Sequence, residues 1–167
     1  MSWMYRAGRA ATRFFLTFFG RLEVTGLECV PPYGPLIVVS NHLSYNDPSA
    51  LFVSLPRTLS YLGKIELFSN PVKRTVMGWV HVFPLDRTST GVDGMRTALD
   101  LLAQDRALVI FPEGRISLDK SLERAKGGAA FIAIKSQAPI LPVGISGTEK
   151  FSPWRMLFPF RRYRVNI

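Results

Sequence analysis

The chain has 167 residues, of which 47% are hydrophobic and 20% are charged, so it is long enough for one domain with a substantial core and too short for two. Lysine and arginine outnumber aspartate and glutamate by 21 to 12, and the net charge of +9 favours an anionic partner: nucleic acid, a phosphorylated metabolite or an acidic membrane surface. The single cysteine, Cys29, excludes an internal disulfide and has no spacing partner for a metal site.

The first predicted element is an amphipathic helix over residues 3–19. At roughly 100° per residue, its arginines fall on one side, while Met4 and the phenylalanines cluster opposite. The arginines are Arg6, Arg9 and Arg13, and the phenylalanines are Phe14, Phe15, Phe18 and Phe19. This pattern favours anchoring at a membrane interface, and the alternative is a helix that packs its phenylalanines on the domain. Because no run of about eighteen apolar residues occurs, we expect no membrane-spanning helix.

The proline-rich segment 30–35 separates this arm, residues 1–30, from a domain that we assign to residues 31–167. Strands and helices then alternate, which predicts a single α/β domain with a largely parallel central sheet flanked by helices. The predicted strands are 36–40, 58–62, 80–83, 107–111 and 140–145, and the predicted helices begin at Asp47 and cover 72–79, 92–104 and 122–136. Residues 163–167 begin to alternate like a strand, and the sequence then stops without a closing turn, which is typical of a chain truncated at its C-terminus.

Two polar residues, His42 and Asp47, follow the predicted strand 36–40. A neutral histidine is the side chain best suited to accept a proton near pH 7, and a carboxylate on its other ring nitrogen fixes the tautomer. Ser40 and Ser44 flank the histidine, but neither lies in a Gly-x-Ser-x-Gly elbow, so we interpret the pair as activating a substrate hydroxyl. The alternative is a loop histidine followed by an aspartate that only caps the next helix.

A second group of polar residues follows other predicted strands. Since parallel strands end at the same edge of a sheet, we expect this group to face His42 across one cleft. Arginine offers a planar fork for a phosphate, and glycine permits close approach of the backbone. A surface ion pair between the acidic and basic members is the alternative explanation. The group consists of Glu113, Gly114 and Arg115, together with Lys64 and Arg87.

In their order along the chain, four motifs of this sequence resemble those of the glycerolipid acyltransferases that use glycerol 3-phosphate or lysophosphatidic acid. His42-x4-Asp47 resembles the first motif of that family. Residues 63–67 with Asp86 and Arg87 are similar to the second motif, residues 111–114 to the third and residues 139–143 to the fourth. The ordered set is far more specific than the first motif alone.

The resemblance implies that His42 is the general base, that Asp47 orients it, and that the acceptor hydroxyl attacks the thioester of acyl-CoA or an acyl carrier protein. The implied acceptor is lysophosphatidic acid and the product is phosphatidic acid, with glycerol 3-phosphate or another lysolipid as alternatives. No metal or other cofactor is implied. The implied acceptor-binding residues are Glu113, Gly114, Arg115, Lys64 and Arg87. Many members have a threonine between the glycine and the arginine, whereas here Arg115 follows Gly114 directly.

A hypothesis from a different class is a peripheral lipid-binding protein without catalytic activity. Nucleic-acid binding fits poorly, because the aromatic residues form two apolar patches instead of lying among cations on an exposed sheet. We therefore expect an enzyme of phospholipid biosynthesis at the cytoplasmic face of the cell membrane. It would be peripheral or monotopic, and its cations would be attracted to anionic lipids.

Overall fold

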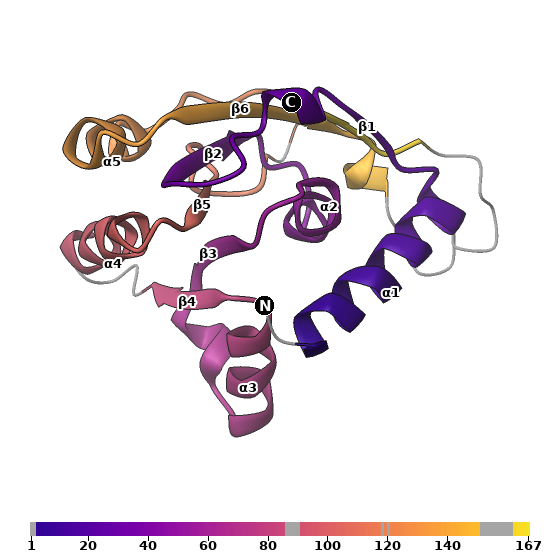
Figure 1. Ribbon diagram of the computed structural model, residues 1–167, viewed down its shortest axis with the longest axis horizontal. Coiled ribbons are helices and arrows are strands. Elements are labelled where there is room, and N and C mark those ends of the chain that lie inside the picture. The colour runs from indigo at the N-terminus through magenta and orange to yellow at the C-terminus, as the bar shows by residue number, and fades with distance from the viewer. Residues whose placement is uncertain (1–2, 86–90, 118, 120, 151–161) are drawn as a thin grey trace.

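The computed structural model describes residues 3–85, 91–117, 119, 121–150 and 162–167 (Figure 1). Within these residues, seven strands form one sheet in the order β1-β7-β6-β2-β5-β3-β4. All neighbouring strands are parallel except β6 and β7, which are antiparallel. The strands are β1 (Glu23–Thr25), β2 (Leu36–Ser40), β3 (Leu59–Lys64), β4 (Val82–Leu85), β5 (Ala107–Ile110), β6 (Ile140–Ser146) and β7 (Arg164–Asn166).

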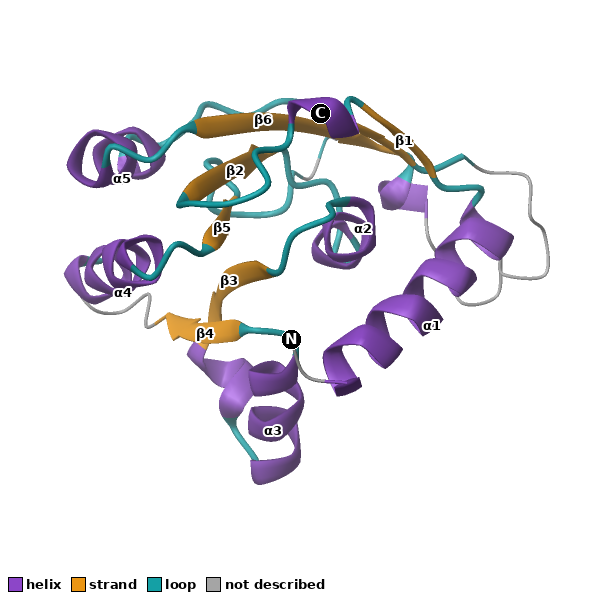
Figure 2. Ribbon diagram, in the orientation of Figure 1, coloured by secondary structure: helices purple, strands orange, loops and turns teal. Residues whose placement is uncertain are grey.

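Helices cover both faces of this sheet (Figure 2). Strand β2 alternates its side chains between the faces, so Leu36 and Val38 pack on one side and Ile37 on the other. Helix α2 (Asp47–Ser54) packs on the first side and carries α1 (Trp3–Gly20), whereas α4 (Val92–Ala103) and α5 (Gly128–Ser136) cover the second. The predicted single α/β domain with a mostly parallel sheet and an N-terminal helix is confirmed.

The remaining helical elements are short. Helix α3 (Pro71–Trp79) packs at the β4 edge of the sheet, next to the 3-10 turn η2 (Ile65–Phe68). The turns η1 (Leu27–Cys29) and η3 (Thr148–Lys150) follow β1 and β6. Strand β1 lies beside β7, so residues of the predicted N-terminal arm take part in the sheet. The division of the chain at residue 30 stays a prediction.

Two predicted elements begin later than expected. The helix predicted over 122–136 begins only at Gly128, because the segment before it is tied to the loop after β5 by the bond from Lys126 N to Pro112 O (2.9 Å). The third strand begins at Val82 instead of residue 80, since His81 adopts φ +55° and makes the turn after α3. The tail patch predicted from Phe151 lies outside the described residues.

Helix α1 divides its residues differently from the prediction. Tyr5 and Leu16 are buried against α2, and Arg9 lies on this same side, where its guanidinium donates to the carbonyl of Leu55. Arg9 is therefore less exposed than Arg6 and Arg13, and its membrane contact stays a prediction. The helical repeat brings residues 5, 9 and 16 onto one stripe, and the long arginine stem reaches a backbone acceptor there.

The phenylalanines of α1 fall into two groups. Phe14 and Phe18 are 69% and 64% exposed and stack on each other at 5.9 Å between ring centroids. Phe15 and Phe19 are half-buried, and Phe15 packs against the cluster that holds α1 on α2. Arg6 and Arg13 are exposed. The alternative, packing on the domain, thus applies to Phe15, whereas membrane contact of the exposed Phe14 and Phe18 stays a prediction. In the described part of the chain, no helix is both long enough and apolar enough to cross a bilayer.

Candidate active site

The loop between β2 and α2 brings His42 and Asp47 together. The Oδ2 atom of Asp47 lies 2.9 Å from Nδ1 of His42 and also accepts hydrogen bonds from the main-chain N–H groups of Leu43 (2.6 Å) and Ser44 (2.8 Å). The Asp47 side chain is completely buried, and that of His42 is 17% exposed. Three donors around one oxygen fix the orientation of the carboxylate.

The second oxygen of Asp47 is also occupied. Its Oδ1 atom accepts from the hydroxyl of Thr148, a buried residue of η3, and from the hydroxyl of Ser44 at 3.4 Å. The carboxylate therefore does not cap α2: the cap residue is Asn46, whose side chain makes no capping bond. Assigning Asp47 as the N-cap was wrong, because its oxygens turn back toward the preceding loop.

The imidazole ring of His42 is fixed on two sides. It stacks on Phe111 with ring centroids 4.1 Å apart and an interplanar angle of 19°. A carboxylate accepts hydrogen bonds, so the contact suits the tautomer of the neutral ring in which Nδ1 carries the proton and Nε2 keeps its lone pair. The main-chain oxygen of His42 also accepts from the N–H of Ser117 at 2.8 Å, which ties this loop to the third motif.

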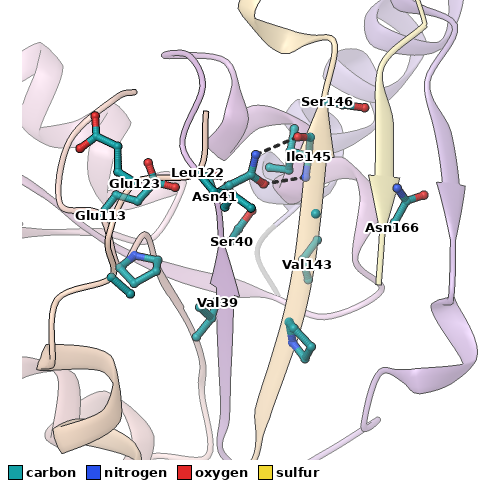
Figure 3. A pocket seen from close by; sticks show the side chains of 14 residues that line it. Val39, Ser40, Asn41, Glu113, Leu122, Glu123, Val143, Ile145, Ser146 and Asn166 are labelled. Carbon is teal, nitrogen blue, oxygen red and sulfur yellow. Dashed lines mark hydrogen bonds between the residues drawn. The ribbon is translucent and has the colours of Figure 1, made fainter. Parts of the chain in front are cut away.

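Asn41 lies where the main chain leaves β2 and turns toward His42. Its side-chain amide donates to the carbonyl of Ile145 (2.9 Å) and accepts from the N–H of the same residue (2.8 Å) (Figure 3). These two bonds continue the pairing of β2 with β6 beyond Ser40, its last paired residue. The side chain thus replaces the main chain in the ladder, and the main chain is free to leave the sheet toward His42.

The third motif lies level with His42. Val39 of β2 pairs with Ile110 of β5, and His42 and Glu113 each follow that pair by three residues. The Glu113 side chain is buried, and neither carboxylate oxygen has a hydrogen-bond partner among the described residues. Burial raises the pKa of Glu113 above its ordinary value, and the nearby main chain of His42 lowers it by less.

Gly114 makes the tight turn after β5. Its φ is +73°, and its N–H donates to the carbonyl of Phe111 at 3.0 Å. A Cβ at this position would lie 3.0 Å from Nζ of Lys126, which crosses over the glycine. The backbone geometry and the neighbouring lysine both explain why glycine is found here.

The three cations predicted to bind the acceptor phosphate differ in where they lie. Arg115 points outward with 65% of its side chain exposed, and its Nε lies 2.8 Å from Oε2 of Glu123, an interaction that raises its pKa. Lys64 ends β3 and is exposed at the same edge of the sheet as the third motif. Arg87 lies outside the described residues. The surface ion pair that we considered thus exists, but Arg115 makes it with Glu123 and not with Glu113.

An open pocket of about 520 Å³ adjoins these residues. Asn41 and Glu113 line it, so it begins directly beside His42, which is not itself among the lining residues. Glu113 and Glu123 lie on one side and the strand carrying Val143 and Ile145 on the other (Figure 3). The volume is within the ordinary range for a small-molecule site. A largely apolar wall with carboxyl groups at one side suits a ligand that has both apolar and polar parts.

Sequence reasoning missed Asn41, Phe111 and Thr148 as parts of this site. Thr148 follows the predicted strand 140–145, and the rule that placed Glu113 at the edge of a parallel sheet applies to it equally. Asn41 and Phe111 are neighbours of predicted site residues in sequence, yet their contacts depend on the pairing of strands. No local pattern shows that an asparagine side chain will replace the main chain in a ladder.

The Acyltransferase family model matches residues 21–146, which include both motifs of this site. A 1-acyl-sn-glycerol-3-phosphate acyltransferase of Bacillus subtilis (strain 168) is 31% identical over 159 residues, which are 92% of this chain and 78% of the relative. The chain belongs to the acyltransferase family. The predicted family membership is confirmed.

Other members of the family are longer than this chain. The chloroplastic 1-acyl-sn-glycerol-3-phosphate acyltransferase BAT2 of Brassica napus is 33% identical over 138 residues, 81% of this chain and 40% of the relative. For the human 1-acyl-sn-glycerol-3-phosphate acyltransferase alpha, the identity is 34% over 134 residues, 78% of this chain and 47% of the relative. The chain thus spans less than half the length of these two relatives.

The fold also matches a solved structure. The 1-acyl-sn-glycerophosphate (LPA) acyltransferase PlsC from Thermotoga maritima superposes with a TM-score of 0.77 over 97% of this chain and 68% of the other. The sequence identity is 24%, so this likeness shows a shared fold.

Proposed function

We propose that the protein transfers a fatty acyl group from acyl-CoA or an acyl carrier protein to the hydroxyl of lysophosphatidic acid, which gives phosphatidic acid. The observation that carries the proposal is the buried contact of 2.9 Å between His42 Nδ1 and Asp47 Oδ2, at the edge of a pocket with an apolar wall. Two relatives that match this chain over most of its length are named for an acyl transfer to 1-acyl-sn-glycerol 3-phosphate.

In the proposed reaction, Nε2 of His42 takes the proton of the acceptor hydroxyl while the hydroxyl oxygen attacks the thioester carbonyl carbon. Asp47 stabilises the imidazolium that forms. The tetrahedral intermediate then collapses, the carbon–sulfur bond breaks, and the leaving thiolate receives the proton from His42. The products are a carboxylic ester and a free thiol, so the imidazole returns to its neutral form.

The acceptor phosphate is proposed to bind on the side of Glu113 and Lys64. A buried carboxyl beside a phosphate is stable only when the two groups share a proton, and the raised pKa of Glu113 supports such sharing. Lys64 is proposed as a cationic contact from the same edge. Arg115 joins them only if the phosphate displaces its ion pair with Glu123. Arg87 is retained as a proposed contact on the family resemblance.

We also propose that the protein is held as a peripheral or monotopic enzyme at an anionic membrane surface on the cytoplasmic side. Phe14, Phe18 and Trp3 form an exposed apolar stripe on α1, flanked by Arg6 and Arg13. Each cation near an anionic leaflet contributes roughly 1 kcal/mol of attraction. Since other residues of α1 are buried, deleting the helix would damage the fold. Replacing both exposed phenylalanines with serine should weaken sedimentation with anionic vesicles and leave the unfolding temperature unchanged.

The deciding experiment measures acyl transfer for each combination of acyl-CoA or acyl carrier protein with lysophosphatidic acid, glycerol 3-phosphate or lysophosphatidylcholine. We expect the highest kcat/KM with lysophosphatidic acid and a fall in this activity of roughly 10²–10⁴-fold in the His42→Ala variant. Preference for another acceptor would support the alternative substrates. Vesicle binding without transfer in any combination would support a non-catalytic lipid-binding protein and refute the proposal.

A further inference from the structure

Helix α3 has an apolar stripe that faces solvent. Val72, Val76 and Trp79 recur at helical spacing and are 73%, 39% and 44% exposed. A surface helix normally turns such a stripe toward the core, but no residue of α3 is buried. The helix lies at the bottom of Figure 1, at the opposite end of the sheet from β6.

The turn before α3 extends this apolar surface. Ile65 and Leu67 of η2 are 49% and 44% exposed, and η2 packs against α3. We call residues 64–79, which comprise the end of β3, η2 and α3, the α3 lobe. Asn70 begins the helix by accepting a hydrogen bond from the N–H of Lys73 at 2.8 Å, so the stripe belongs to a properly capped helix.

The α3 lobe also carries three cations. Lys64, Lys73 and Arg74 are exposed there, and Glu66 is the lobe's one acidic residue. An apolar helix face bordered by cations is the pattern of helices that lie in the interface of anionic membranes. The same positive charge disfavours pairing between two copies of the lobe, because like charges would be brought together.

The first turn of α1 lies near the end of α3. The rings of Tyr5 in α1 and His81, two residues after α3, are 5.1 Å apart between centroids. Trp3 lies two residues before Tyr5 and is 75% exposed, while Trp79 lies two residues before His81. Each element thus carries an exposed tryptophan two residues along the chain from this contact, and tryptophan is typical of membrane–water interfaces.

We propose that the α3 lobe is a membrane-docking surface that inserts its Val72, Val76 and Trp79 stripe into an anionic lipid bilayer. Lys64, at the start of the lobe, lies at the same sheet edge as Glu113, so docking would bring lipid to the side of the pocket. This inference goes beyond the acyl transfer proposed above and does not depend on it.

The direct test observes the lobe itself. In a Trp3→Phe, Trp154→Phe variant, Trp79 is the one remaining tryptophan of the three in the sequence. We expect its emission to shift to shorter wavelength on adding phosphatidylglycerol-containing vesicles, and to be quenched by lipids brominated on their acyl chains. An unchanged spectrum while the protein co-sediments with the vesicles would overturn the proposal.

Matched charge variants test the location of the attraction. Lys73→Glu and Arg96→Glu change the net charge equally, and both residues are exposed, but Arg96 lies on α4. Each reversal removes a cation and adds an anion, so we expect Lys73→Glu to weaken vesicle partitioning about 20-fold or more, at about fivefold per unit of charge. Arg96→Glu should have a much smaller effect. Equal effects would mean that only net charge matters and would overturn the proposal.

Apolar variants test insertion. Val72→Asn with Val76→Asn should weaken partitioning by about tenfold or more, because about 0.8 kcal/mol is lost for each buried methylene. Ile134→Asn on α5 is the control, since Ile134 is 70% exposed at a distant site of the molecule. If the valine variants instead convert a dimer to a monomer in light scattering, the stripe contacts a second copy and the proposal is wrong.

The activity assay separates this proposal from the proposed function. With a short-chain lysolipid below its micellar concentration, the Val72→Asn, Val76→Asn variant should match the native protein. With the same head group in vesicles, its rate should fall by the factor measured for partitioning. Absence of transfer in the native protein would refute the acyl-transfer function, and the fluorescence result would still decide the role of the lobe.

Discussion

The two halves of the site differ in how completely their polar groups are satisfied. Asp47 is fully buried and accepts hydrogen bonds from His42, Leu43 and Ser44 on one oxygen and from Thr148 on the other. Glu113, which lies level with His42 at the edge of the sheet, is nearly as buried as Asp47 but has no hydrogen-bond partner for either oxygen among the described residues. One carboxylate is preorganised, and the other lacks a partner.

This difference separates the roles that the two sides are suited to play. A side chain held by several bonds keeps its geometry without substrate, which lowers the reorganisation needed during the reaction. A buried carboxyl without partners is costly by itself and gains stability when a ligand supplies one. Changes on the first side should therefore lower kcat, and changes on the second should act on substrate binding and on the stability of the free protein.

The largest effect is expected from Asp47→Asn. The amide can keep its oxygen toward His42 and its nitrogen toward Thr148, so the geometry is largely retained while the charge is lost. We expect kcat for acyl transfer to fall roughly 10²–10⁴-fold with little change in KM, as for loss of general base catalysis. The His42→Ala variant should fall in the same range, and the double variant should be no worse than either single one. If the losses of the two single variants multiply in the double variant, His42 and Asp47 do not act in one shared step.

Thr148→Val should have an intermediate effect. Valine has nearly the shape of threonine but cannot donate to Asp47, and a hydrogen bond to a charged group is worth about 1.5–3 kcal/mol. We expect kcat to fall about tenfold or more with KM unchanged. Thr148→Ser keeps the hydroxyl and should restore most of the rate. If the serine variant is as impaired as the valine variant, Thr148 acts by packing instead of by positioning Asp47.

Substitution of the cations on the Glu113 side of the site should mainly change KM. Lys64→Ala is expected to raise KM for lysophosphatidic acid about fivefold to tenfold, since one phosphate contact is lost. Arg115→Ala should raise it less than about threefold, because Glu123 already neutralises Arg115 at 2.8 Å. Glu123→Gln releases the guanidinium and should lower KM. A large loss in Arg115→Ala alone would mean that the phosphate displaces Glu123.

The sequence predicted the fold well because each buried parallel strand is a short apolar run with a clear end. Residues 36–40 and 107–111 agree closely with β2 and β5, and the edge rule then placed Glu113 level with His42. The spacing of His42 and Asp47 likewise describes a contact within one loop. Such features depend on neighbours in the chain and can be recognised locally.

Sequence reasoning missed the partners of side chains whose acceptors lie far away or in unexpected loops. Arg9 and Arg13 are both arginines of one amphipathic helix, yet the acceptor that turns Arg9 inward is the carbonyl of Leu55, 46 residues away. The phosphate contact of Arg115 stays a prediction, but the sequence did not indicate that Glu123 would lie 2.8 Å from it, because a helix was predicted where Glu123 lies in a loop. These outcomes depend on tertiary contacts that the helical repeat and the motif do not contain.

The smallest predicted effect concerns stability and tests whether Glu113 is unsatisfied. Burial raises the pKa of Glu113, so the folded protein binds this proton more tightly than the unfolded chain does. Stability is therefore lost as pH rises from the ordinary glutamate pKa through the raised one. Glu113→Gln cannot ionise, and its unfolding temperature should exceed that of the native protein by roughly 2–4 °C above this window, which corresponds to about 1 kcal/mol.

The gain in Glu113→Gln should vanish below the ordinary glutamate pKa of about 4.3, where both the folded and unfolded carboxyl are protonated. Glu28→Gln is the control, since Glu28 is exposed on η1 and should gain nothing at any pH. Thermal unfolding followed by circular dichroism from about pH 4 to pH 8 measures both variants. A Glu113→Gln variant that is less stable at high pH would mean that the native carboxylate is satisfied without ligand. The two sides of the site would then be equally preorganised, and substrate binding would no longer explain the buried charge.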